Sequence, residues 1–416
     1  MKKYEWNLKF LYFVAAVSSL SSAGAAMTLL ALSSGFFVEN PEGFASSAIQ
    51  LSYYLGICCI GFFGGGIFQK WSAVSLGLYG PLISSSVVFY LATFDAIPVV
   101  LGIPSIFIIF LLNGIDHPNN LRFFNETVPE HQKIKFFSFT ESITAFFQII
   151  SPLIAGVIIA FIGLKACFIL DGFTYLISAL PWLIIKRKLG EPAAPQLIEK
   201  NDFFLGFKVL YQNPNVRTLT ISRMLNNLSY VTCTTAIPLV IAKIANNDQQ
   251  LFTLNLAITN TLISSGFIGA GLLGAVFSRN YNVVLLVYSA SFLALGACVV
   301  LTVAILNPLF LYIAALLLGI GTYCFRLSGM TLGQAFTPPS VLGPVIIAGD
   351  TVVRGWSFFV SASTLFIFEL HNLSGMSLGT FFLMLNILPC GSLLAPQWSL
   401  SLARKYAKKA LQTPIQ

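Results

Sequence analysis

The feature that most constrains this chain is the repetition of long apolar stretches separated by short polar turns. A helix that crosses the hydrocarbon core of a bilayer needs about 20 consecutive apolar residues. Only 9% of the residues are charged, whereas soluble domains carry roughly 25%. The sequence therefore predicts an all-α membrane protein, and 416 residues leave room for about twelve transmembrane helices.

The apolar stretches form two sets of six on either side of a polar segment that contains several prolines and charges, which marks a linker. The chain is thus expected to divide into an N-terminal six-helix bundle (1–185), a cytoplasmic linker with a surface helix at Phe203–Gln212 (186–213), a C-terminal six-helix bundle (214–403) and a basic tail (404–416). The expected spans are Phe10–Phe37, Gly43–Phe68, Ala73–Phe94, Ile97–Ile115, Ile134–Phe161, Leu164–Ile185, Val216–Lys243, Leu251–Ser278, Val283–Leu306, Pro308–Phe325 or slightly beyond, Pro344–Leu370 and Ser377–Leu394.

A cleaved signal peptide is the competing interpretation of the first span, because Ala23-Gly24-Ala25 imitates a cleavage site. We expect the span to be retained, since it is longer than a typical signal core and its removal would leave an odd number of helices.

The positions of Lys and Arg predict the orientation in the membrane. One side receives only Lys165 and Lys243, while the other receives the basic residues of the N-terminus, the linker, the tail and the remaining loops. We therefore expect both termini in the cytoplasm and a location in the bacterial inner membrane. Because these loops account for the net charge of +8, we expect the lipid bilayer, and no nucleic acid, as a partner.

Two spans carry a carboxylate about two turns inside their start, and these residues, Glu141 and Asp350, lie 209 residues apart. The same offset relates the basic residues Lys70 and Arg279, each at the end of a span. An ungapped offset of about half the chain length indicates a duplicated architecture of two six-helix pseudo-repeats.

Three motifs follow one another within Val128–Ile185: the loop VPEHQKIKFF, the helix segment QIISPLIAG and the helix segment FILDGFTYLISA. In their order and sequence they resemble the drug:proton antiporter group of the major facilitator superfamily, which contains macrolide efflux proteins and enterobactin exporters. The resemblance covers nearly the whole chain and implies the major facilitator fold. The superfamily motif G-x-L-A-D-R keeps its base here as Lys70 and Arg279, but Gln69 and Ser278 replace the acid.

The resemblance implies a central cavity lined by the first, fourth, seventh and tenth spans. In the seventh span, Arg223, Asn226, Asn227 and Tyr230 share one helical face, because their spacing is i, i+3, i+4 and i+7. The fourth and tenth spans add Asn113, Tyr323 and Arg326. Interhelical hydrogen bonding is the alternative role for each Asn. Arg223 is expected to attract an anionic substrate group or to pair with a carboxylate on another helix.

The candidate residues for coupling or gating are Lys70, Glu141, Asp171, Arg279, Asp350 and Arg354. Asp171 matches the Asp of the family's sixth span, and its alternative role is structural, bonding backbone groups of a neighbouring helix. The resemblance places the fifth span against the eighth and the second against the eleventh. It thus suggests two ion pairs between the halves, Glu141 with Arg279 and Asp350 with Lys70. In the alternative arrangement Asp350 pairs with Arg354, four residues further along its own helix.

The chain lacks the motifs HExxH, GxSxG and GxxxxGK[ST], and its seven Cys all lie in apolar spans. We therefore expect no enzyme activity, no metal and no cofactor. The expected function is proton-coupled efflux of small amphipathic organic molecules, of the drug or siderophore type, by alternating access. Siderophore uptake is an alternative suggested by Arg223, Arg326 and Arg354. A non-transporting receptor or assembly factor, and lipid movement, are the others.

Overall fold

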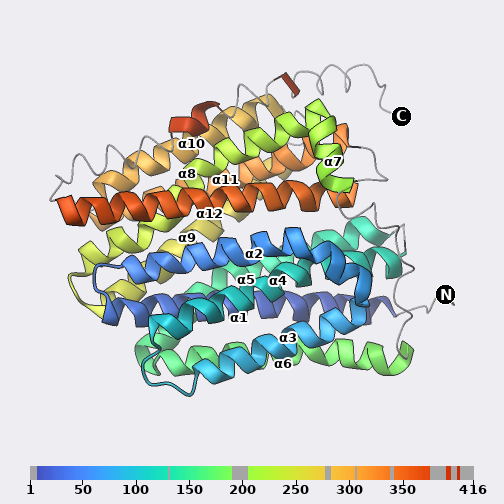
Figure 1. Cartoon of the computed structure of the whole chain (residues 1–416), viewed down its shortest axis with the longest axis horizontal. Helices are drawn as coiled ribbons and strands as arrows, with labels where there is room; N and C mark the ends of the chain where they lie inside the picture. Colours follow the sequence, from blue (N-terminus) through green and yellow to red (C-terminus); the bar gives the residue numbers. More distant parts are fainter. Residues whose placement is uncertain are drawn as a thin grey trace.

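The computed structural model describes residues 7–129, 132–189, 205–276, 283–304, 307–337, 342–374, 390–394 and 401–402. All regular structure in these ranges is helical, as the sequence predicts. The helices run side by side along the long axis of the molecule, and the short α7 lies across one end (Figure 1). They are α1 (Leu8–Glu39), α2 (Phe44–Lys70), α3 (Ala73–Leu91), α4 (Val99–Thr127), α5 (Lys133–Phe161), α6 (Leu164–Leu189), α7 (Leu205–Gln212), α8 (Pro214–Ala245), α9 (Gln249–Val276), α10 (Val283–Val303), α11 (Pro308–Phe336) and α12 (Leu342–Ser374).

Nine helices in the described ranges are long and apolar enough to cross a membrane, and shorter apolar segments lie in α2 and α10. The eleven expected spans up to Leu370 correspond one to one to α1–α6 and α8–α12. The last expected span, Ser377–Leu394, falls outside the described residues except for a short 3-10 helix at Gly391–Leu394.

Local capping explains several helix boundaries. The side chains of Asn7 and Ser72 accept hydrogen bonds from backbone N–H groups in the first turns of α1 and α3, as N-cap residues do. Asn213 does the same for α8, where Pro214 follows at the first helical position. α8 ends at Asn246, which adopts the left-handed conformation with φ of 46°.

Two helices are longer than the sequence predicts. Residues 116–135 were expected as a polar loop, but α4 continues to Thr127, and α11 likewise continues to Phe336. In α4 the extension is amphipathic: buried Phe123 and Phe124 contact Trp182 and Phe136, with ring centroids 4.9 and 4.8 Å apart. Hydropathy alone missed this extension because helix formation depends on one packed face, not on uniform apolarity.

The expected duplication appears in the packing. α4 and α11 begin 209 residues apart, and so do α5 and α12. In the first bundle (α1–α6), Gly56 of α2 lies against the backbone of Phe107 and Leu111 in α4. In the second bundle (α8–α12), Gly266 of α9 lies against the backbone of Leu316 and Ile320 in α11. Each glycine lets two helices approach closely, because a Cβ there would lie within 3.0 Å of backbone atoms of its neighbour.

The two bundles meet through α5 with α9 and α2 with α12, as the resemblance implies. Many described contacts between them lie towards the end of the molecule where α1 ends and α9 begins, called here the far end. Phe37 stacks on Phe252 with ring centroids 4.1 Å apart, and Thr253 donates a hydrogen bond to Ser34 over 2.9 Å. Tyr54 and Thr234 lie 3.4 Å apart, nearer the middle. The end where α1 begins is called the near end.

Candidate functional site

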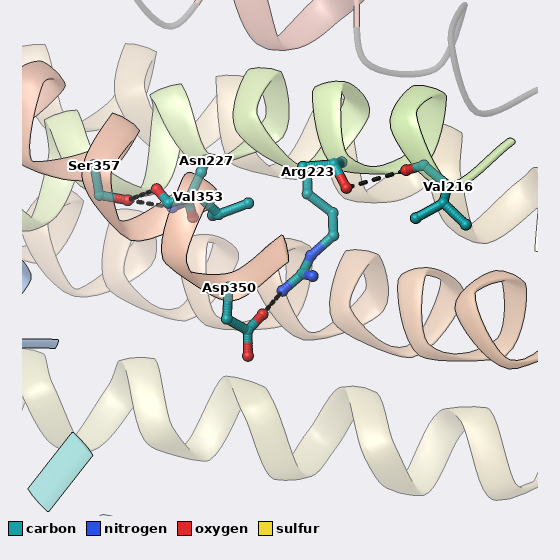
Figure 2. A network of polar contacts seen from close by, with 7 residues as sticks. Val216, Arg223, Asn227, Asp350, Val353 and Ser357 are labelled. Atoms are coloured by element: carbon teal, nitrogen blue, oxygen red, sulfur yellow. Dashed lines mark hydrogen bonds and ion pairs between the residues drawn. The ribbon is translucent and has the colours of Figure 1, made fainter. Parts of the chain in front are cut away.

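The centre of the second bundle holds an ion pair between Arg223 of α8 and Asp350 of α12 (Figure 2). The residues lie about 14 Å and 12 Å from the near-end starts of their helices, at 1.5 Å per residue. Pairing between helices was one of the two roles expected for Arg223. Their side chains remain 34% and 50% exposed, although both helices are apolar spans. The pair therefore borders an accessible space rather than a closed core.

Two further guanidinium groups surround this pair. Arg354 of α12 and Arg326 of α11 both lie within electrostatic range of Asp350. Arg326 is exposed, although it sits within the apolar helix α11. Among the described side chains, this cluster of Arg223, Arg326, Arg354 and Asp350 (the arginine cluster) carries three positive charges and one negative charge.

The arginine cluster also contacts the first bundle. The guanidinium of Arg354 lies over the ring of Tyr53 in α2, 5.7 Å from its centroid. This cation–π contact differs from the expected pairing of Arg354 with Asp350 along one helix. Tyr54, beside Tyr53, is 1% exposed and also lies near Arg354. The cluster thus faces the boundary between the bundles.

The polar face of α8 divides into two parts. Asn227 donates a hydrogen bond to Ser357 of α12 over 2.7 Å, and Ser357 in turn donates to the carbonyl of Val353 (Figure 2). Tyr230 is partly buried within electrostatic range of Arg354 and Arg326. Asn226, in contrast, is 3% exposed and lies in the protein interior. Arg223, Asn227 and Tyr230 therefore remain cavity candidates, and Asn226 does not border the accessible surface.

Two other cavity candidates are packed against neighbouring helices. Tyr323 of α11 stacks on Phe267 of α9 with ring centroids 6.1 Å apart. Asn113 of α4 donates to the hydroxyl of Tyr175 in α6 over 3.1 Å, so the interhelical hydrogen-bonding role applies to it. Both Asn113 and Tyr175 line a cavity of about 230 Å³ inside the first bundle, together with Asp116 and Ser84.

Asp171 of α6 is fully buried between helices of the first bundle. Its carboxylate accepts hydrogen bonds from Thr28 of α1 over 2.5 Å and from Thr174 over 3.2 Å. Gly24 of α1 faces the same carboxylate, and a Cβ there would collide with Asp171 and Thr174. The expected structural role had Asp171 bonding backbone groups, but its partners are hydroxyl groups. Their side chains reach it because Gly24 leaves room between α1 and α6.

Three candidates cannot be placed. Lys70 ends α2 and Glu141 lies within α5, but their side chains are outside the described part of the structure, as is the whole of Arg279. The two ion pairs expected between the halves therefore remain predictions. In the described part of the structure, Asp350 pairs with Arg223.

No group of three or more His, Cys, Asp or Glu residues that could hold a metal ion occurs in the described ranges. Two buried thiols, Cys233 of α8 and Cys298 of α10, lie 3.1 Å apart.

Several residues of the site were not singled out from the sequence: Tyr53, Tyr54, Thr28 and Ser357. Each is an ordinary residue of an apolar span, and its role comes from a partner that is distant in the sequence. Ser357 lies 130 residues from Asn227, and Thr28 lies 143 residues from Asp171. Tyr53 and Tyr54 form an aromatic pair that hints at a special position, but two tyrosines in a membrane helix are equally typical of packing.

Comparison with known proteins agrees with this architecture. The family model of the Major Facilitator Superfamily matches residues 11–362. Macrolide efflux protein A of Streptococcus pyogenes is 25% identical over 321 residues, which cover 74% of this chain and 76% of that protein.

Solved transporter structures share the fold at low sequence identity. A POT family transporter in complex with a thioalcohol-conjugated peptide has a TM-score of 0.71 at 14% identity, covering 95% of this chain and 96% of that one. The nucleoside transporter NupG has a TM-score of 0.64 at 13% identity, covering 97% and 100%. The helical architecture and the family match together show that the chain belongs to the Major Facilitator Superfamily.

Proposed function

We propose that this protein exports small amphipathic organic molecules across the bacterial inner membrane, driven by a proton gradient. The observation that carries the proposal is the similarity to Macrolide efflux protein A, which extends over about three quarters of both chains. A match over this length covers both bundles, so it includes the boundary between them where a substrate would bind.

Alternating access supplies the mechanism. The described contacts Phe37–Phe252 and Ser34–Thr253 support closure at the far end, while the arginine cluster remains accessible about 12–14 Å from the near end. With both termini in the cytoplasm, as the basic loops predict, the near end is the cytoplasmic one. The substrate then enters from the cytoplasm, and rocking of the two bundles opens the far end.

Within this mechanism the boundary residues take different roles. Arg223, Arg326 and Arg354 provide charge, while Asn227 and Tyr230 provide hydrogen bonds and an aromatic face. Asp350 is a better candidate than Asp171 for a residue that exchanges partners during transport. Asp350 is half exposed, whereas Asp171 is enclosed by hydroxyl groups.

Uptake of an anionic molecule of the siderophore type is the second candidate. The excess of guanidinium groups over carboxylates in the cluster favours it, because a fixed positive surplus attracts an anion. A receptor without transport would bind the same ligand and move none of it.

Flux measurements in proteoliposomes test the proposal. Purified protein is reconstituted with its near end outward, as established by protease access to residues 186–213, and the interior is made acidic. A labelled amphipathic compound that the protein carries, with erythromycin and naphthalene-2-carboxylate tested in parallel, should accumulate inside by exchange with protons, and a protonophore should abolish the accumulation. Empty liposomes are the control. Accumulation only when the gradient is reversed would support uptake instead, and binding without flux of any tested compound would indicate a receptor.

A further inference from the structure

We propose that Asp350 occupies the position of a substrate carboxylate, and that an anionic group of the transported molecule replaces it on Arg223. The transported molecule is thus an organic acid with an apolar, ring-containing body. This inference deepens the proposed function and rests on it, since it names the substrate class of the same central site.

The charge balance of the cluster allows such an exchange. In the described part of the site, Arg223 pairs with Asp350, and Arg354 and Arg326 lie within electrostatic range of it. When a second carboxylate arrives, Arg223 binds it and Asp350 stays within range of Arg354 and Arg326. The site then holds three positive and two negative charges, so each carboxylate keeps a cationic neighbour and no proton has to be taken up.

The geometry of the pair leaves a place for the incoming group. The ion pair joins Nη2 of Arg223 to Oδ1 of Asp350, and the other carboxylate oxygen is directed away from Arg223 (Figure 2). A guanidinium has five N–H donors and favours bidentate carboxylates. Gly349 and Gly329 flank the Arg223 side chain, where Cβ positions would lie 3.5 Å from Nη1 and 3.9 Å from Cδ. A Cβ at either position would make ordinary van der Waals contact with Arg223, and glycine leaves that small volume unfilled.

Accessibility makes this pair available to a ligand. Solvent screens an exposed ion pair, which therefore contributes little to stability. Arg223 and Asp350 are 34% and 50% exposed inside the protein. An approaching molecule therefore reaches both partners before it has to displace any packed side chain.

Aromatic rings beside the cluster suit the apolar body of the ligand. Tyr53 of α2 lies under Arg354, and partly buried Tyr230 of α8 lies near both Arg354 and Arg326. These rings come from both bundles, so a ligand held between them contacts each half of the transporter. An acid without an apolar body would gain the charge interaction alone.

Binding of three probes of one shape tests the proposal. The full-length protein in lipid nanodiscs is titrated with labelled naphthalene-2-carboxylate, and 2-naphthamide and 2-naphthylmethylammonium serve as competitors. The carboxylate should bind about tenfold or more tightly than either competitor, because charge-assisted hydrogen bonds outweigh neutral ones. Preference for the ammonium compound would overturn the inference.

The decisive comparison is between variants of the two partners. D350N removes the internal competitor and should tighten carboxylate binding by threefold or more, on the order expected for loss of a weak competing ion pair. R223Q should weaken binding about tenfold or more, and R223K should lie between wild type and R223Q. If the pair is only structural, D350N and R223Q will weaken binding by similar factors, which contradicts the proposal.

A covalent probe covers the case in which the binding variants do not fold. In a background without the native cysteines, D350C should react faster with the anionic reagent sulfonatoethyl methanethiosulfonate than with its trimethylammonium analogue. The matched variant D350C with R223Q should lose most of this preference. Equal rates for both reagents in D350C would contradict the site. Gradient-driven flux of any tested compound that persists while the charge order fails would refute this inference and leave the proposed export intact. The absence of flux of every tested compound through the wild-type protein would refute the export.

Discussion

Two carboxylates within membrane helices, Asp171 and Asp350, have opposite surroundings. Asp171 in the first bundle is 0% exposed, and its oxygens accept hydrogen bonds from Thr28 and Thr174. Asp350 in the second bundle is half exposed and meets guanidinium groups from three helices. Hydroxyl partners are short and fixed, whereas arginine side chains are long and can change partners. We infer that Asp171 holds α1 and α6 of the first bundle together, whereas Asp350 of the second bundle can exchange its partners.

The same contrast extends to the neighbours of each carboxylate. Beside Asp171, Gly24 allows α1 and α6 to pack closely, since any Cβ at Gly24 would collide with the carboxylate. Around Arg223 a Cβ on Gly349 or Gly329 would make only ordinary van der Waals contact, at 3.5 and 3.9 Å. Glycine thus permits close packing beside Asp171 and leaves a small volume unfilled beside Arg223.

The substitution with the largest expected effect is Gly24→Ala, which tests the packing around Asp171. The added methyl group should destabilise the protein by about 2 kcal/mol, because Asp171 and Thr174 have no free space to move into. Thermal unfolding of purified protein in detergent measures the change. Gly80→Ala in α3 is the control, since nothing lies within 4 Å of its Cβ position. An equal effect of both substitutions would show that Asp171 is not tightly enclosed.

Removing the two carboxylates in turn tests the comparison directly. Asp171→Ala should cost about 2 kcal/mol of stability, since it leaves the buried hydroxyl group of Thr28 without its acceptor. Asp350→Ala should cost less than about 1 kcal/mol, because Arg223 remains partly exposed to solvent. Unfolding temperatures of both variants, measured side by side, decide the order. The reverse order would contradict the inferred difference between an enclosed Asp171 and an exchangeable Asp350.

A substitution of Tyr53 tests whether the arginine cluster is coupled to the first bundle. Tyr53→Leu removes the ring beneath Arg354 and should shift the equilibrium between the two accessible states by about two- to fivefold. Labelling of a cysteine introduced near the boundary, compared from the two sides of the membrane, reports the shift. Tyr53→Phe keeps the ring and should behave like wild type; a shift of the same size in both would assign the effect to the hydroxyl group.

A third, surface carboxylate provides the reference for a minor effect. Asp95, in the loop before α4, pairs with Lys165 over 2.6 Å, and its side chain is 98% exposed. The hydrogen bond and charge of Lys165 hold the pKa of the Asp95 carboxyl below its usual range. The small stabilisation is therefore present at neutral pH and disappears as the pH falls through this lowered pKa. Asp95→Asn should give the smallest change in unfolding temperature, and its difference from wild type should vanish in acid.

Much of the fold was predictable, because helices that span a membrane can be identified from local composition. The starts of α3, α10 and α11 coincide with the expected ones, and the offset between Glu141 and Asp350 recurs in the starts of α5 and α12. The near-end extensions of α4 and α11 were missed, since their apolar residues cover one face only. The face of α8 was predicted from spacing, but its members differ in burial because Asn226 points towards packed neighbours.

The sequence by itself determined which residues lie in membrane helices, where isolated charges fall among them and how the halves repeat. These properties depend on hydropathy and on spacing within one helix. The tertiary structure decided which charges meet: Asp350 is joined to Arg223, 127 residues away, and Asp171 to Thr28, 143 residues away. Such pairings depend on the rotation of each helix and on its neighbours in space. For that reason Arg354, one turn from Asp350 in the same helix, lies over Tyr53 of the other bundle.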